Sequence, residues 1–196
     1  MAFEQKAWYD KAFISVSPVG GNEYELRAKT TSLSISGGNF DIEGIETFGG
    51  KVTRVGTRED IEISFDGIPV STQDYDWIFH GLNSNTSGWA NGTGSIDSWT
   101  EKKFRVSVLW TNQSGVTGAT QAITGTNEAY RQVYAEAYCT NVENSMDAGE
   151  HLTANLTFNL PVEDETGGSN YKLSAKDTTS GTLSAVPSYT TTTKYW

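Results

Sequence analysis

The clearest pattern in this chain is a strict alternation of apolar and polar residues over residues 152–160. The apolar set is Leu152, Ala154, Leu156, Phe158 and Leu160, and every residue between them is Thr or Asn. A period of two places alternate side chains on opposite faces of a strand. This segment is therefore predicted to be a strand with one buried face and one polar face.

The same period recurs at residues 104–110 and 61–65. Phe104, Val106, Val108 and Trp110 share one phase of the first segment. In the second, Ile61, Ile63 and Phe65 are expected to face the core, which turns Glu62 and its in-phase neighbours outward. Further strands are predicted at 12–17, 23–36, 39–48, 51–57 and 171–175, separated by Gly-Gly pairs.

Residues 130–140 fit two kinds of element. Their alanines suit a helix, whereas Tyr and Val in alternate positions suit a strand. We predict a strand that returns through Asp147-Ala148-Gly149 into residues 152–160 as a hairpin. One short helix is expected at about 72–81, and residues 83–100 and 111–126 are expected to be loops.

These elements predict one all-β domain over residues 1–196. The expected fold is an antiparallel β-sandwich or partial barrel with one short helix, long hairpins and extended arms at 1–11 and 178–196. Such folds host many functions, so the fold alone selects none of them.

Composition narrows the function classes. The chain has 14 basic and 24 acidic residues, a net charge of -10, two histidines and one cysteine. A protein that grips nucleic acid would show a basic excess, and a single cysteine excludes an internal disulfide. No apolar run approaches the ~20 residues of a membrane-spanning helix. We predict no enzyme activity, no cofactor, no metal and no membrane partner, and we expect Cys139 to be a buried thiol.

Two local features keep alternatives open. Residues 163–168 have calcium-binding chemistry without the spacing of an EF-hand, so a charged turn is the preferred interpretation. Trp89 and Trp99 could stack on sugars, or they could anchor a loop onto the core or a neighbouring molecule. The alternative functions are therefore a carbohydrate-binding module and another self-assembling surface subunit, such as a pilus subunit or adhesin.

Two stretches of the chain resemble the major tail tube proteins of long-tailed, siphovirus-like viruses of bacteria or archaea. One runs from Asp41 to Val52 and on through Arg58 to Pro69, and the other is the hairpin from Val142 to Pro161. The resemblance covers about half the chain. It implies a β-sandwich flanked by a helix, whose copies form hexameric rings that stack into a tube.

The resemblance also implies partners and a location. The partners would be further copies of this chain and other tail proteins. DNA would pass through the lumen without specific binding, and the virion tail would be assembled in the host cytoplasm. Strands at 39–48 and 51–66 would continue the sheet of a neighbour, because an unpaired strand edge is a template for pairing.

This interpretation selects two groups of site residues. The acids expected to face the lumen are Glu43, Glu46, Asp60, Glu62 and Asp66, since an acidic wall repels DNA; the alternative is that they face the outside of the particle. The aromatics expected at subunit interfaces are Phe3, Trp8, Tyr9, Trp89, Trp99, Tyr189, Tyr195 and Trp196. Large aromatic residues at chain ends suit burial against another subunit.

Overall fold

The protein is built from strands throughout the part that the computed structural model describes. That part comprises residues 12–20, 23–26, 32–68, 103–145, 153–179 and 181–196. It contains no helix, and the predicted all-β class is confirmed as a curled, half-barrel antiparallel sheet. The helix predicted at 72–81 and the loop at 83–100 lie outside the described residues.

The strands follow the predicted segments closely. They are β1 (Ala12–Pro18), β2 (Tyr24–Leu26), β3 (Leu33–Gly37), β4 (Phe40–Thr47), β5 (Gly50–Arg58), β6 (Ile61–Gly67), β7 (Phe104–Thr111), β8 (Ile123–Thr124), β9 (Ala129–Ser145), β10 (Thr153–Leu160), β11 (Tyr171–Lys176) and β12 (Thr182–Leu183). The single strand predicted over 23–36 is two strands, β2 and β3. The loop predicted at 111–126 contains the short strand β8.

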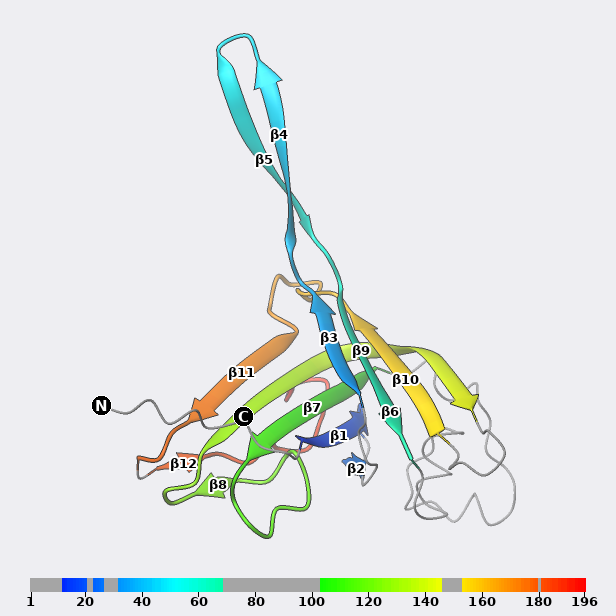
Figure 1. Ribbon diagram of the computed structural model, residues 1–196, viewed down its shortest axis with the longest axis vertical. Coiled ribbons are helices and arrows are strands. Elements are labelled where there is room, and N and C mark those ends of the chain that lie inside the picture. The colour runs from blue at the N-terminus through cyan, green and yellow to red at the C-terminus, as the bar shows by residue number, and fades with distance from the viewer. Residues whose placement is uncertain (1–11, 21–22, 27–31, 69–102, 146–152, 180) are drawn as a thin grey trace.

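The long strand β9 holds the main sheet together (Figure 1). The sheet has the order β2-β1-β7-β9-β10-β6-β3, and every pairing is antiparallel. The first half of β9 pairs with β7 on one edge and with β11 on the other, and its second half pairs with β10. The predicted strand at 130–140 and its antiparallel return are therefore confirmed.

The inner side of the curled sheet holds the main core. Phe158 lies at its centre, with its ring centroid 6.0 Å from that of Phe65 and 5.8 Å from that of Phe104. The residues of β6 and β10 that face this core are the ones that the alternation selects, including Ile61, Ile63 and Leu156. Their polar neighbours in sequence point outward, so the phase predicted for both strands is confirmed.

The outer face is different over the two halves of the sheet. Over β1, β7 and the first half of β9, residues 112–128 and the C-terminal segment cover a second apolar cluster around Leu109, Ile123 and Leu183. Over β3, β6, β10 and the second half of β9, the outward side chains are polar and solvent-facing. The sheet therefore presents one open polar face.

A two-stranded hairpin, β4–β5, projects far from this body (Figure 1). It continues from the β3–β6 pair, and hydrogen bonds between the Gly38, Asn39 and Glu59 backbones cross the junction. Gly37 makes the junction possible, because its φ is +92° and a Cβ there would lie 2.0 Å from the backbone oxygen of Asp60. The predicted Gly37-Gly38 turn is thus a bend within a continuous ribbon.

The packing of Phe158 gives the first prediction. Phe158→Ala should lower the free energy of unfolding by about 3–5 kcal/mol, because the cavity left by a core phenylalanine refills only in part. Urea unfolding measures this loss. Leu173→Ala is the control: Leu173 is 48% exposed on β11, and a surface change should stay within about 0.5 kcal/mol. A loss for Phe158→Ala no larger than that of the control would contradict the core assignment.

Candidate functional site

The projecting hairpin carries an unusual number of exposed apolar side chains. Ile42 is 66% exposed and Val55 is 58% exposed, and they are directly opposite each other on neighbouring strands. Phe40 and Ile45 are also exposed, and Phe48 at the tip is fully exposed. A two-stranded hairpin is at best marginally stable alone in water. This concentration of apolar surface therefore marks an interaction surface.

The pairing of β4 with β5 places apolar side chains on both faces of the hairpin. Ile42 and Ile45 are three residues apart in one strand, so they lie on opposite faces. Both faces are therefore partly apolar. Cross-strand partners of opposite charge, Glu43 with Arg54 and Glu46 with Lys51, keep the ribbon soluble between these positions.

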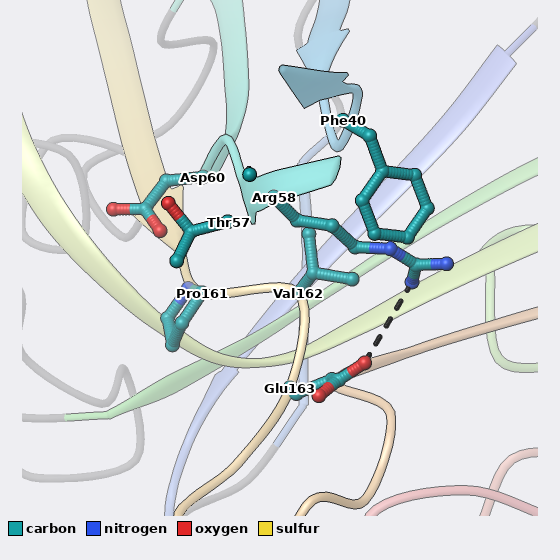
Figure 2. Close-up of a pocket in the computed structure, with 8 residues that line it drawn as sticks. Phe40, Thr57, Arg58, Asp60, Pro161, Val162 and Glu163 are labelled. Atoms are coloured by element: carbon teal, nitrogen blue, oxygen red, sulfur yellow. Dashed lines mark ion pairs between the residues drawn. The ribbon is translucent and has the colours of Figure 1, made fainter. Parts of the chain in front are cut away.

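A pocket of about 320 Å³ lies at the base of the hairpin (Figure 2). Its lining comes from the base of the hairpin and from the segment after β10, and consists of Phe40, Gly56, Thr57, Arg58, Asp60, Pro161, Val162 and Glu163. The guanidinium carbon of Arg58 lies 4.3 Å from the centroid of the Phe40 ring. A guanidinium nitrogen of Arg58 is also 3.9 Å from a carboxylate oxygen of Glu163. The pocket lining thus combines apolar side chains with charged ones.

The open polar face of the sheet is a second candidate surface. The amide of Asn155 donates to a carboxylate oxygen of Asp66 at 2.8 Å, and the amide of Asn159 donates to the hydroxyl of Thr140 at 3.2 Å. Glu62 and Glu143 are exposed on the same face. No Lys or Arg occurs in β3, β6, β10 or the second half of β9. This face offers hydrogen-bonding groups, negative charge and the ring of Tyr138, which is 40% exposed opposite Asn159.

The five predicted lumen acids do not share one surface. Glu62 and Asp66 lie on the open polar face. Asp60 lies at the junction and lines the pocket. Glu43 and Glu46 stand on opposite faces of the projecting hairpin, because they are three residues apart. The structure therefore brings together only two of the five.

Of the aromatics predicted at subunit interfaces, only those at the C-terminal end can be placed. Tyr189 is 2% exposed and lies over Arg105, with the guanidinium carbon 5.3 Å from its ring centroid. Tyr195 and Trp196 are half-buried on the same chain. The other predicted interface aromatics, Phe3, Trp8, Tyr9, Trp89 and Trp99, lie outside the described residues. The segment expected to be an arm over 178–196 instead packs against its own sheet, because buried side chains bind it there.

Two buried arginines hold that segment. Arg105 donates to the backbone oxygen of Lys194 at 3.3 Å and to a carboxylate oxygen of Glu23 at 2.5 Å. Arg131 donates to the backbone oxygen of Ser184 at 2.5 Å. The ammonium of Lys194 in turn bridges the carboxylates of Glu136 at 2.7 Å and Asp164 at 2.8 Å. Nothing in the alternation of β7 or β9 identifies these arginines as buried, so the sequence analysis missed them.

Metal and thiol chemistry find no support in the described part of the chain. That part contains no cluster of three or more metal-ligating side chains. The oxygens of Asp164 accept hydrogen bonds from Thr166 and Gly168 within the loop and from Lys194 of the C-terminal segment, so the acidic loop at 163–168 is a charged turn. Cys139 is a buried thiol, as predicted, and its burial raises the pKa of the thiol to about 12. Among the described residues, no helix is long and apolar enough to span a membrane.

Comparison with known proteins gives distant structural likenesses. No protein-family model matches the chain, and no curated protein matches it. A PVC sheath/tube terminator of an extracellular contractile injection system, in the extended state, has a TM-score of 0.49 and 14% identity, covering 89% of this chain and 99% of that one. The tube-terminating cap of the anti-feeding prophage gives 0.44 and 15%, over 90% and 100%. The secreted protein Hcp3 from Pseudomonas aeruginosa gives 0.33 and 13%, over 85% and 99%. At these scores the likeness alone assigns neither a family nor a function.

The half-buried Glu23 gives a prediction of pH dependence. Burial raises the pKa of its carboxyl from 4.5 to about 7, although Arg105 opposes this. Between these two pH values the folded chain keeps a proton that the unfolded chain has lost. The contribution of Glu23 to the free energy of unfolding therefore falls as the pH rises through this window.

Glu23→Gln should remove this contribution. Chemical unfolding between pH 4.5 and 8 should show the variant losing less stability than the parent as the pH rises. Glu165→Gln, at an exposed position of the 163–168 turn, should follow the parent. Parallel stability profiles for Glu23→Gln and the parent would contradict the raised pKa.

Proposed function

We propose that this chain is a structural tail tube subunit of a long-tailed, siphovirus-like virus of bacteria or archaea. Its copies form hexameric rings that stack into a tube, and the genome leaves the virion through the lumen. The observation that supports this most is the projecting β4–β5 hairpin, whose exposed apolar side chains have no cover in the described part of the chain. The sequence resemblance to tail tube proteins supports the same function.

The hairpin serves as the contact between copies. Burying apolar surface contributes about 25 cal/mol per Å², and the hairpin offers apolar side chains on both faces. Within the described residues its outer strand edges are also unpaired, which makes them templates for a neighbouring strand. Both features favour insertion between other copies of the chain.

The open polar face serves as the wall of the lumen. It spans the β9–β10 and β3–β6 pairs, so two hairpin-like units of each subunit contribute to it. Glu62, Asp66 and Glu143 make it negative, and its Asn, Ser and Thr side chains are partly engaged with each other. DNA finds no cation to bind on such a surface, so it passes without sticking.

The hairpin contact is tested by Ile42→Ser combined with Val55→Ser. Removing this exposed pair should leave the stability of the body within about 0.5 kcal/mol. It should raise the concentration at which rings or tubes form by roughly tenfold or more, since each buried aliphatic side chain contributes about 1.5–3 kcal/mol. Light scattering and electron microscopy over a concentration series measure this.

Leu173→Ser is the matched control, because it removes an exposed aliphatic side chain from the body. It should assemble like the parent. If the double variant assembles at the parent's concentration, the hairpin is not the contact. If the parent remains monomeric at high concentration and in varied salt, the proposed function itself is wrong.

The lumen assignment is tested by charge reversal on the open polar face. Glu62→Lys with Glu143→Lys should make assembled tubes retain DNA, with retention falling steeply as salt rises. The readout is a short duplex added before assembly and then challenged with nuclease. Glu165→Lys with Asp177→Lys changes the net charge equally, at exposed positions outside β3, β6, β10 and the second half of β9. If both pairs of substitutions protect the same amount of DNA, this face does not line the channel.

A further inference from the structure

The two ends of the β4–β5 hairpin have complementary shapes. The tip carries Phe48, which is fully exposed in the two-residue loop between Thr47 and Gly50. The base carries the pocket of about 320 Å³ between Phe40, Thr57 and Val162. The hairpin thus has a projecting aromatic side chain at its tip and a pocket lined in part by an aromatic side chain at its base.

We propose that the pocket at the hairpin base receives Phe48 from the hairpin tip of a second copy of this chain. This inference rests on the proposed self-assembly and assigns its contact to particular residues. A buried aromatic side chain in a desolvated pocket is the usual anchor of a protein interface. Phe48 is the aromatic that the described chain offers most completely to a neighbour.

The tip is shaped to enter a recess. Gly49 and Gly50 follow Phe48, and the space where their Cβ atoms would lie is empty. The ring of Phe48 therefore stands on a narrow backbone loop without flanking side chains on that side. Any larger residue at these two positions would widen the tip and hinder its entry.

The pocket matches the tip in chemistry as well as in shape. Its lining includes three apolar side chains, those of Phe40, Pro161 and Val162. The guanidinium of Arg58, already 4.3 Å from the Phe40 ring, can also stack on an incoming aromatic. Asp60 and Glu163 of the lining are opposite in charge to Lys51, which directly follows Gly50 at the tip.

The arrangement also determines the kind of assembly. The tip and the pocket are different surfaces of the same chain, so their contact is heterologous rather than two-fold symmetric. A heterologous contact that does not close continues indefinitely. We assign this repeating contact to the junction between successive layers of the proposed tube.

Two variants separate the halves of this contact. Phe48→Ala removes the tip aromatic and leaves the pocket, and Thr57→Trp fills the pocket and leaves the tip. Each alone should raise the concentration for growth between layers by roughly ten- to a hundredfold. A 1:1 mixture of the two variants should form paired layers and grow no further. The tip of Thr57→Trp can enter the pocket of Phe48→Ala, but neither variant can make the reverse contact. Sedimentation velocity and negative-stain microscopy distinguish these states, and Leu173→Ala should behave like the parent.

A crosslink gives a second readout that does not depend on the filled pocket. At a protein concentration above that at which Phe48→Ala assembles, Phe48→Cys with Thr57→Cys should form a ladder of disulfide-linked oligomers on oxidation, whereas Phe48→Cys alone should stop at dimers. The native Cys139 is buried and should remain unreactive.

Three results would overturn the assignment. If Phe48→Ala assembles like the parent, Phe48 is not the side chain that enters the pocket, although the proposed function stands. This holds even if Thr57→Trp blocks growth, because another group would then occupy the pocket. The contact between Phe48 and the pocket is also ruled out if the mixture forms no paired layers and the double-cysteine variant forms no ladder. A parent chain that never assembles overturns both proposals.

Discussion

Apolar side chains that nothing in the described part of the chain covers are the constraint on which this structure depends. The curled sheet buries its own core around Phe158 completely, so the body does not need the hairpin for stability. The hairpin, by contrast, leaves Phe40, Ile42, Ile45, Phe48 and Val55 in water. Water disfavours such a surface by about 25 cal/mol per Å². A second molecule that covers the hairpin removes that penalty, which is why we place the function there.

The backbone at the junction between the body and the hairpin holds the hairpin away from the body. Gly37 adopts a φ of +92° beside the carbonyl of Asp60, in a space where no Cβ fits. The two strand pairs on either side of this point are joined by backbone hydrogen bonds. The hairpin is therefore a continuation of the sheet, aimed away from the body, and it cannot fold back to bury itself without breaking those bonds.

The sequence predicts the body well because burial there has one clear phase. Residues 152–160 alternate without exception, and β10 buries the apolar set that this alternation selects. The hairpin has no such phase, since Ile42 and Ile45 fall on opposite faces. Apolar residues on both faces of a strand indicate that no single core buries that strand. This departure from the period of two is the sequence signal that identifies the hairpin as an interaction surface. The same departure explains why the sequence predicts one surface for Glu43 and Glu46, which lie on opposite faces of the hairpin.

Other features have no sequence signal at all. Arg105 and Arg131 occupy positions that read as solvent-facing, and they become buried only because the C-terminal segment returns over the sheet to accept their hydrogen bonds. That return joins residues 89 and 53 positions apart in the chain, which local patterns do not encode. The pocket at the hairpin base likewise joins β4–β5 to the segment after β10.

Another copy of the chain should cover the hairpin in the assembled protein. Hydrogen exchange measured by mass spectrometry, at concentrations below and above assembly, tests this directly. Amides of residues 40–58 should become strongly protected on assembly, while those of β10 within the core should change little. Assembled protein in which residues 40–58 exchange as fast as in the monomer would contradict it.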